Sequence, residues 1–298
     1  MNLRKQDGEL YSRSSFVVSR QSLNRHLKSP AVGKTFDIIA DSDFSDANTA
    51  FKAMCKKMRQ EGKGKVHHKP SIQKGGIIKL YNHPPVFNPN IPSGLLNKFF
   101  FDIILYFCRR GQENLPEMKS DDFETKTDDD GKQYICKVTS ELTKNHQGVE
   151  SEDFEPKGGR MYATDTPMCP VASFLIYLNK RHPDCAALWQ RTKDVYDDEN
   201  EVWFEKKPLG VNILGEMMLK ISKAADLSKT YTNHSIRATC ITLLNDSSFE
   251  GRHIVTISGH LSEESIKKTT AVTHPTNRKG TCLSQFLSIQ QYVIMQMC

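Results

Sequence analysis

The chain has 298 residues, of which 38% are hydrophobic and 26% charged, and its formal net charge is +6 at pH 7. These values describe an ordinary soluble protein with room for about two domains. No run of about 18 apolar residues is present, which excludes a membrane-spanning helix. The polar residues 1–11 lack the apolar core of a secretory signal, so we expect an intracellular protein.

The eight cysteines lie apart from one another, without a C-x-x-C pair, and several fall within apolar stretches. This usage predicts reduced, buried thiols and neither disulfides nor a zinc site. The positive charge permits a polyanionic partner without requiring one. Its distribution is more informative, because lysines and arginines crowd residues 52–69 whereas acidic residues gather at 121–130, 150–155 and 197–201.

Two helices are predicted near the start of the chain. Residues 14–27 carry apolar side chains at helical spacing, and residues 43–61 carry a longer apolar stripe that Gly62 ends. We expect these helices to form a small helical unit. Residues 62–71 have the Lys, Gly, His and Pro content of a basic linker.

The rest of the chain predicts a larger domain that is mostly helical. Residues 94–110 are strongly apolar and predict a buried helix. Residues 134–142 follow an Asp-Asp-Asp-Gly turn signal and predict a hairpin strand. Further helices are expected from Cys169-Pro170 through Leu178, over residues 212–225 and over residues 231–244. The predicted fold class is therefore mainly α with one small β-sheet (α+β).

A phosphate-binding pattern lies near the carboxyl end, in Asn233-His234-Ser235-Ile236-Arg237 and the following Ser258-Gly259-His260. His234 and Arg237 project from one face of the predicted helix, near its start. Helix N-termini attract anions, and the arginine fork matches phosphate oxygens. The alternative is a capped helix with a hydrogen-bonded histidine and a surface arginine, because H-x-x-R alone is a weak pattern.

Two further segments carry side chains suited to a phosphate. Arg110 ends the predicted buried helix, and Glu113 could fix the orientation of its guanidinium. Alternatively, Arg109 and Arg110 only complement the negative end of that helix. Lys144 lies at the expected hairpin tip, where it is either a solvated side chain or a general acid for a leaving oxygen.

The order of these motifs resembles the catalytic domain of tyrosine recombinases and integrases. The stretches that carry the resemblance favour the Crypton-type branch, which includes domesticated relatives such as the C-terminal domains of MYM-type zinc-finger proteins. The resemblance covers residues 12–273. Its motifs are Arg109-Arg110-Gly111-Gln112-Glu113-Asn114-Leu115, Thr143-Lys144-Asn145-His146-Gln147-Gly148, Cys169-Pro170 and Tyr231-Thr232-Asn233-His234-Ser235-Ile236-Arg237.

The resemblance implies a domain order and a set of roles. Residues 1–66 would be a partial helical core-binding domain, residues 67–275 the catalytic domain and residues 276–298 a tail. Arg110, Arg237 and His260 would hold the scissile phosphate, His234 would assist proton transfer at the nucleophile, and Lys144 would protonate the leaving 5′ oxygen. We expect further DNA contacts from the basic linker and its neighbours: Lys56, Arg59, Lys63, Lys65 and Arg109. No cofactor or metal is implied, because arginine, histidine and lysine neutralise the phosphate.

The chain departs from the family pattern at the nucleophile. Thr269 stands where the family has a tyrosine, and an aliphatic hydroxyl is less acidic than a phenol, whose pKa is about 10. Tyr292 lies well beyond the usual interval. The family's helical domain also has more residues before the first helix than this chain provides.

Three hypotheses follow for function. The first is a nuclear, recombinase-derived protein that binds double-stranded DNA without cutting it, with assembly into a homo-oligomer on DNA left open. The second is an active strand transferase that uses Thr269 or Tyr292. The third is a protein-interaction module on a relic fold.

Overall fold

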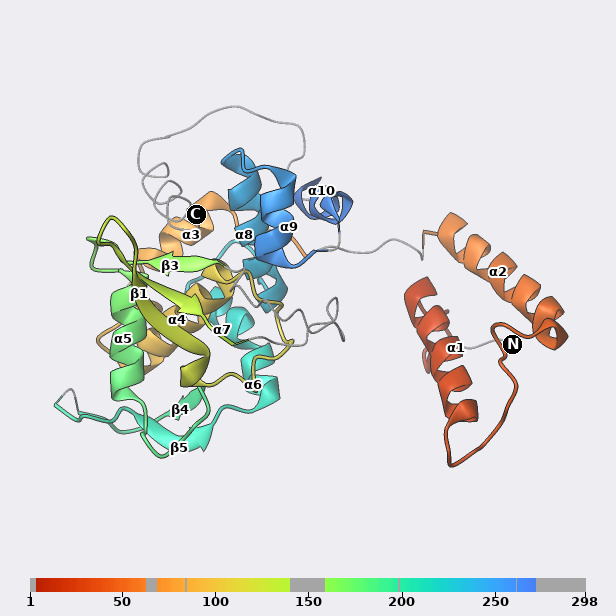
Figure 1. The fold of residues 1–298 in the computed structure, drawn as a ribbon, viewed down its shortest axis with the longest axis horizontal. Coiled ribbons are helices and arrows are strands. Elements are labelled where there is room, and N and C mark those ends of the chain that lie inside the picture. Colours follow the sequence, from red (N-terminus) through yellow and green to blue (C-terminus); the bar gives the residue numbers. More distant parts are fainter. Residues whose placement is uncertain are drawn as a thin grey trace. The chain divides into compact units, whose positions relative to one another are not determined.

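The computed structural model describes residues 4–62, 69–83, 85–139, 159–197, 199–260 and 262–271. The chain divides into two compact units, which comprise residues 1–67 and residues 68–298 and which we call unit 1 and unit 2 (Figure 1). Each unit has its own hydrophobic core. The fold class is α+β, with more helix than strand, as predicted.

Over residues 4–62, unit 1 contains two helices and a short 3-10 turn. The helices are α1 (Arg13–Lys28) and α2 (Ser45–Gln60), and the turn is η1 (Ser42–Phe44). Their core is small and contains the buried Phe16, Cys55 and Met58. Phe51 adds to this core by stacking on Phe16, with ring centroids 4.9 Å apart. The two helices predicted from the apolar spacing are thus present, with shifted ends.

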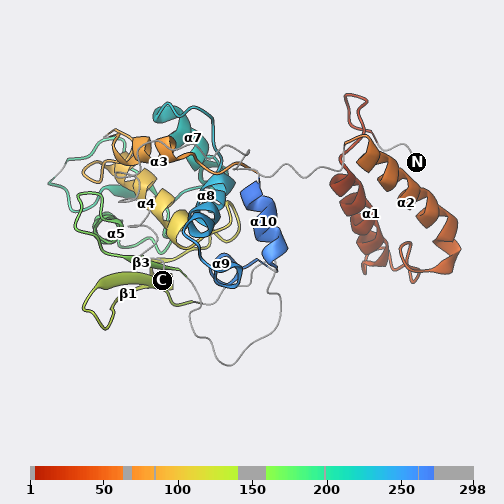
Figure 2. The same cartoon turned by 90° about the horizontal axis from the view of Figure 1, so that it is seen from above.

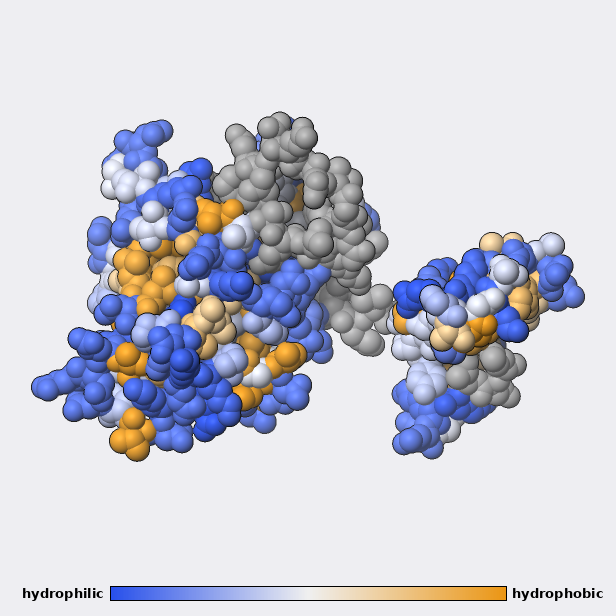
Figure 3. Space-filling view, turned by 60° about the horizontal axis from the view of Figure 1, so that its bottom comes forward, coloured by the Kyte–Doolittle hydropathy of each residue, from blue (hydrophilic) through white to orange (hydrophobic). Residues whose placement is uncertain are grey.

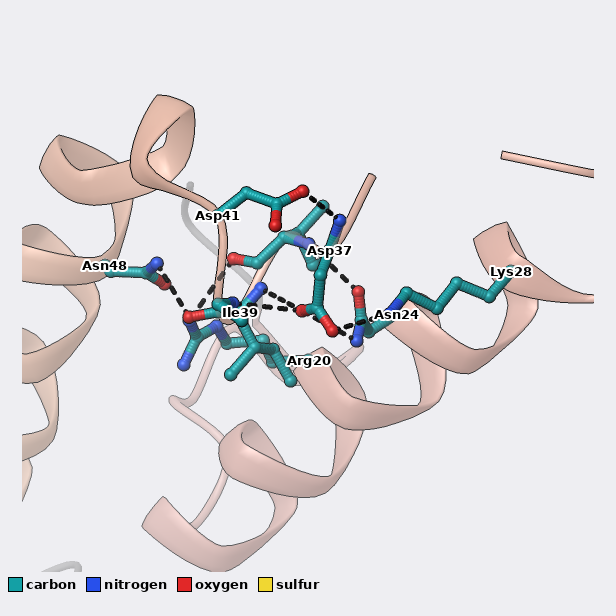
Figure 4. Close-up of polar contacts among 9 residues, drawn as sticks. Arg20, Asn24, Lys28, Asp37, Ile39, Asp41 and Asn48 are labelled. Carbon is teal, nitrogen blue, oxygen red and sulfur yellow. Dashed lines mark hydrogen bonds and ion pairs between the residues drawn. The ribbon is translucent and has the colours of Figure 1, made fainter. Parts of the chain in front are cut away.

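The carboxylate of Asp37 makes most of the side-chain hydrogen bonds that hold the loop between these helices, and that of Asp41 accepts one from the N–H of Asp37 (Figure 4). Asp37 accepts hydrogen bonds from the Lys28 ammonium at 2.6 Å, from the Asn24 amide at 3.1 Å and from the backbone N–H of Ile39 at 2.7 Å. These donors, Lys28 first, hold the pKa of Asp37 well below its ordinary value. Asn48 of α2 also donates to the carbonyl of Ile39, so the loop is tied to both helices.

Unit 2 is built around one buried helix, α4 (Pro92–Tyr106). Because this helix is apolar on all sides, it lies inside the unit and packs against α5, α7 and α8 (Figure 2). The other helices of unit 2 lie around it or beyond it along the chain. They are α3 (Lys74–Tyr81), η2 (Ser120–Asp122), α5 (Pro170–Lys180), α6 (Val211–Gly215), α7 (Met217–Ala224), α8 (Asn233–Asp246), α9 (Gly251–Ser258) and α10 (Glu263–Ala271).

A buried ion pair lies within α4. The side chains of Lys98 and Asp102 are 0% and 2% exposed, and their charged atoms are 2.6 Å apart. Tyr81 of α3 donates its hydroxyl to the other oxygen of Asp102 at 2.6 Å. Burial, followed by the charge of Asp102, raises the pKa of Tyr81 well above its ordinary value. The pair therefore joins α3 to α4.

Among the described residues of unit 2 there are also two antiparallel sheets. The first has the order β1 (Phe123–Thr127), β2 (Gln133–Lys137), β3 (Arg160–Tyr162), and β1 and β2 form the hairpin that the turn signal predicts. The described part of β2 is shorter than the predicted strand, whose last residues lie outside the described ranges. The second sheet pairs β4 (Gln190–Thr192) with β5 (Phe204–Pro208). The prediction of a single sheet was therefore wrong, because such short strands give no clear alternation of apolar residues.

The predicted helix over residues 212–225 is in fact two helices, α6 and α7, separated at Glu216. Gly215 at this point has a low helix propensity, and the Gln112 amide lies 2.9 Å from where a Cβ of that glycine would be. The carbonyl of Leu214 and the N–H of Met218 would bond to each other in a continuous helix. Both instead bond to the side chain of Asn233.

The surface of the protein is mixed in character. The face in Figure 3 is mostly hydrophilic, with separate hydrophobic patches. Large apolar side chains exposed in unit 2 are Leu175, Ile176, Val195, Val211 and Ile213. Within the described ranges, no helix has both the length and the apolar character that a membrane span requires.

Candidate phosphate-binding site

Arg110 lies in a loop that follows α4. The helix ends at Tyr106, and Cys108 takes a left-handed conformation with φ 45°, while the N–H of Arg109 bonds back to Ile104 at 3.0 Å. The prediction that Arg109 and Arg110 belong to the helix was therefore wrong, because the left-handed residue turns the chain away first. Arg110 does form the expected ion pair with Glu113.

Helix α8 supplies His234 and Arg237 from its first turns, as the sequence predicts. Arg237 is half-buried, and its guanidinium donates to the carbonyl of Cys108 and to that of Ser258. It thus connects the loop after α4 with the end of α9. His234, in contrast, is exposed on the surface of the helix.

His260 follows directly on the end of α9. Gly259 takes a left-handed conformation with φ 61° and ends that helix, which directs the histidine back toward α8. Its Nδ1 atom lies 2.6 Å from the Ser258 hydroxyl and 3.4 Å from Nη2 of Arg237. Burial, followed by the charges of Arg237 and Arg110, lowers the pKa of His260 to about 4. At neutral pH this ring is therefore uncharged and can act as a hydrogen-bond donor or acceptor.

His234 has a different set of neighbours. Gly111 lies so close that a Cβ there would be 2.8 Å from both the backbone nitrogen and Nδ1 of His234. Although His234 is exposed overall, partial loss of water around its ring, and then the charges of Lys69 and Arg237, lower its pKa.

Lys69, which the sequence places in the basic linker, therefore contributes positive charge at His234. The segment after Lys69 is fixed on α8, because the N–H of Ile72 donates to the Thr239 hydroxyl at 2.8 Å. Ile72 is buried in the core of unit 2. The basic run 52–69 was a signal for Lys69, but nothing in the sequence relates that run to α8.

Thr269, at the expected place of the nucleophile, lies on α10. This helix packs against α8 and α9, and its Ile266 is buried in the core of unit 2. The Thr269 hydroxyl donates to the carbonyl of Ser265 at 3.1 Å, one turn earlier in the same helix. It is thus bonded to its own backbone.

The remaining predicted residues fall into two groups. Lys56 and Arg59 are exposed on α2 of unit 1, and Arg109 is half-buried next to Arg110. Lys63, Lys65 and Lys144 lie outside the described residues.

The cluster of Arg110, Arg237, His260, His234 and Lys69 can bind an oxyanion. The guanidinium groups offer several N–H donors, the neutral histidines can donate further hydrogen bonds, and the lysine adds positive charge. Glu113 is the carboxylate that we find bonded to the cluster. Within the described ranges, no three His, Cys, Asp or Glu side chains are placed to hold a metal ion. The described cysteines are free, buried thiols, as predicted.

No protein-family model and no curated protein sequence matches this chain. Solved structures similar to it include a lambda integrase(75-356) dimer bound to a COC' core site, with 10% identity over 92% of this chain and 83% of that chain and a TM-score of 0.42. XerA recombinase has 14% identity over 92% and 82% of the two chains and a TM-score of 0.40. The Tn1549 transposon integrase in complex with circular intermediate DNA has 11% identity over 97% and 88% and a TM-score of 0.43. Similarity at this level assigns no role to any residue of the site.

Proposed function

We propose that this protein binds double-stranded DNA through its phosphate backbone, on a fold derived from a Crypton-type tyrosine recombinase, and that it does not cut the strand. The observation that carries the proposal is the position of Arg237. Its guanidinium donates to the carbonyl of Cys108, two residues before Arg110, and to that of Ser258, two residues before His260, so three segments distant in the sequence meet at this side chain.

A phosphodiester, which offers several oxygens to hydrogen-bond donors, suits this arrangement better than a simple halide. Arginine forks match pairs of phosphate oxygens, and Arg110 and Arg237 approach from different segments of the chain. Contacts to the backbone give affinity without base recognition, so we expect binding that depends weakly on sequence and strongly on salt. The exposed Lys56 and Arg59 of unit 1 add sites for phosphate contacts.

Thr269 supports the absence of cleavage. A nucleophile for this reaction must lose its proton, and a phenol does so far more readily than an aliphatic alcohol. In addition, the hydroxyl proton of Thr269 is directed to the carbonyl of Ser265. Attack on phosphorus would require this bond to break.

Salt-dependent DNA binding tests the first part of the proposal. Fluorescence anisotropy of a labelled duplex, measured across a range of NaCl concentrations, should give an affinity that falls steeply with salt. Arg110→Ala should weaken binding roughly 10- to 100-fold, the value of a hydrogen-bonded charge. Lys207→Ala is a matched control, because it removes one exposed charge from β5, at the other end of unit 2 from α9 (Figure 1). Salt-independent binding, or equal losses in the two variants, would reject the proposal.

A nicked duplex that traps covalent intermediates tests the second part. We expect no protein–DNA adduct under conditions in which an active tyrosine recombinase gives one. An adduct whose mass maps to Thr269 or Tyr292 would establish an active strand transferase instead. A protein that binds no DNA at all would favour the interaction module. Sedimentation of the DNA complex would show whether it contains more than one copy.

A further inference from the structure

Asn233 is a buried residue next to the candidate site, and no pattern in the sequence indicates a role for its side chain. Its side chain is 1% exposed. Its Nδ2 atom donates to the carbonyl of Gly111 at 2.8 Å and to that of Leu214 at 2.7 Å, while its Oδ1 atom accepts from the N–H of Met218 at 3.0 Å. The reversed amide would place an oxygen against two carbonyls, so these bonds fix its orientation.

These three bonds join three segments of unit 2. Leu214 and Met218 flank the break between α6 and α7, and Asn233 takes the place of the backbone bond that would have closed it. A helix ending whose polar groups are buried needs such a partner. Gly111, the third partner, belongs to the loop after α4.

Arg110 lies between two points at which this loop is attached to α8. On one side Asn233 donates to the carbonyl of Gly111, and on the other Arg237 donates to that of Cys108. Asn233 and Arg237 are four residues apart and so lie on one face of the helix. The backbone of Gly111 lies so close to His234 that a side chain at position 111 would collide with it. The backbone on both sides of Arg110 is therefore fixed to the helix that carries His234 and Arg237.

We propose that Asn233 is a positioning residue of the site, which holds the Arg110 loop against α8 so that Arg110 and Arg237 face the same phosphate. It touches no ligand itself and acts through the backbone of Gly111. The expected effect of Asn233 on DNA affinity rests on the proposed function. The expected effect of Asn233 on the geometry of the site is independent of that function.

The pKa of His260, measured by NMR titration of the histidine ring, tests this without DNA. Arg110 contributes positive charge near His260, so Arg110→Ala should raise that pKa by roughly 0.5 to 2 pH units. Asn233→Ala should raise it in the same direction, because the loop is released. In the double variant the pKa should be no higher than in Arg110→Ala alone. A folded Asn233→Ala protein with the wild-type pKa, or additive effects in the double variant, would overturn the proposal.

Ser222→Ala is a control for a simple loss of stability. Ser222 is also buried, donates to the carbonyl of Met218 at 2.7 Å and accepts from the N–H of Tyr231 at 3.1 Å, without contacting the Arg110 loop. It should lower the melting temperature and leave the pKa of His260 unchanged. If Asn233→Ala does not fold, Gly111→Ala gives the same test, because its methyl group would displace the loop from His234.

DNA affinity then separates the two proposals. Asn233→Ala should weaken binding as much as Arg110→Ala does, with no further loss in the double variant. If the wild-type protein does not bind DNA but the pKa of His260 rises as expected, the proposed function fails and the positioning role stands.

Discussion

His260 illustrates how the site acts on a single residue. Its pKa of about 4 in the folded protein lies below the value of about 6.5 of an unfolded chain. Above pH 6.5 the ring is neutral in both the folded and the unfolded protein, so titration of His260 takes nothing from the stability there. As the pH falls from 6.5 to 4, the unfolded chain takes up a proton that the folded protein does not, and stability is lost.

We therefore expect the free energy of unfolding to decrease over this pH range, with a contribution from His260 of up to about 1.4 kcal/mol per pH unit. Urea denaturation at a series of pH values measures it. His260→Gln should flatten the profile, whereas His253→Gln, at an exposed position of α9, serves as the control. An unchanged profile in His260→Gln would contradict the expectation.

Lys69 carries a second prediction at this scale. Because its charge helps to lower the pKa of His234, Lys69→Ala should raise that pKa. If the protein binds DNA as proposed and Lys69 contacts a phosphate, the substitution should also reduce the slope of log affinity against log salt by about 0.9. Ring NMR and the salt titration measure the two effects. Lys223→Ala, which removes an exposed charge from α7, should change neither.

The sequence indicates the residues that would contact a phosphate more clearly than it indicates the residues that position them. His234 and Arg237 are related by helical periodicity, which is a local property. Asn233 owes its role to hydrogen bonds with segments far away in the chain, and Lys69 acts by its charge on a histidine of another segment, and no spacing rule predicts either. Glu113 lies between these cases, since it pairs with Arg110 within one turn.

Among the elements, α4 depends on its buried ion pair. Asp102→Ala would leave the ammonium of Lys98 buried without its partner, which should cost about 3–5 kcal/mol. The double variant Lys98→Met, Asp102→Leu replaces the pair by apolar side chains of similar size and should recover part of that loss, because the Tyr81 hydroxyl would still lack its acceptor. Chemical denaturation measures both. Equal destabilisation in the single and double variants would show that the pair has another role.

The elements also show where sequence periodicity fails. The apolar run of α4 predicted a buried helix correctly, but its end depends on the left-handed Cys108, which no side-chain pattern announces. Residues 212–225 have helical periodicity throughout, and yet Asn233, a residue outside the segment, divides them. The small helix α3 and the strands β4 and β5 are too short to give a periodic signal.

At the scale of the whole molecule, the two units differ in the size of their cores. The described part of unit 1, residues 4–62, has a core of three buried hydrophobic residues, and so its stability depends on few contacts. Phe16→Ala should cost about 3–5 kcal/mol and unfold unit 1. Unit 2, which has a core of its own, should keep its melting temperature. Circular dichroism and calorimetry of the full chain measure this, and a shift of both units together would show that they fold as one.

The division into two units has a consequence for how tightly the protein would bind a duplex. If both units contact the same DNA, the binding of one confines the other to a small volume, and its effective concentration reaches roughly the millimolar range. Weak DNA contacts from α2 would then add to those from the loop after α4, even though the two elements belong to units with separate cores. The affinity of the intact chain would exceed that of either unit by a factor that the joining segment sets, and cutting that segment would abolish the gain without altering a single contact.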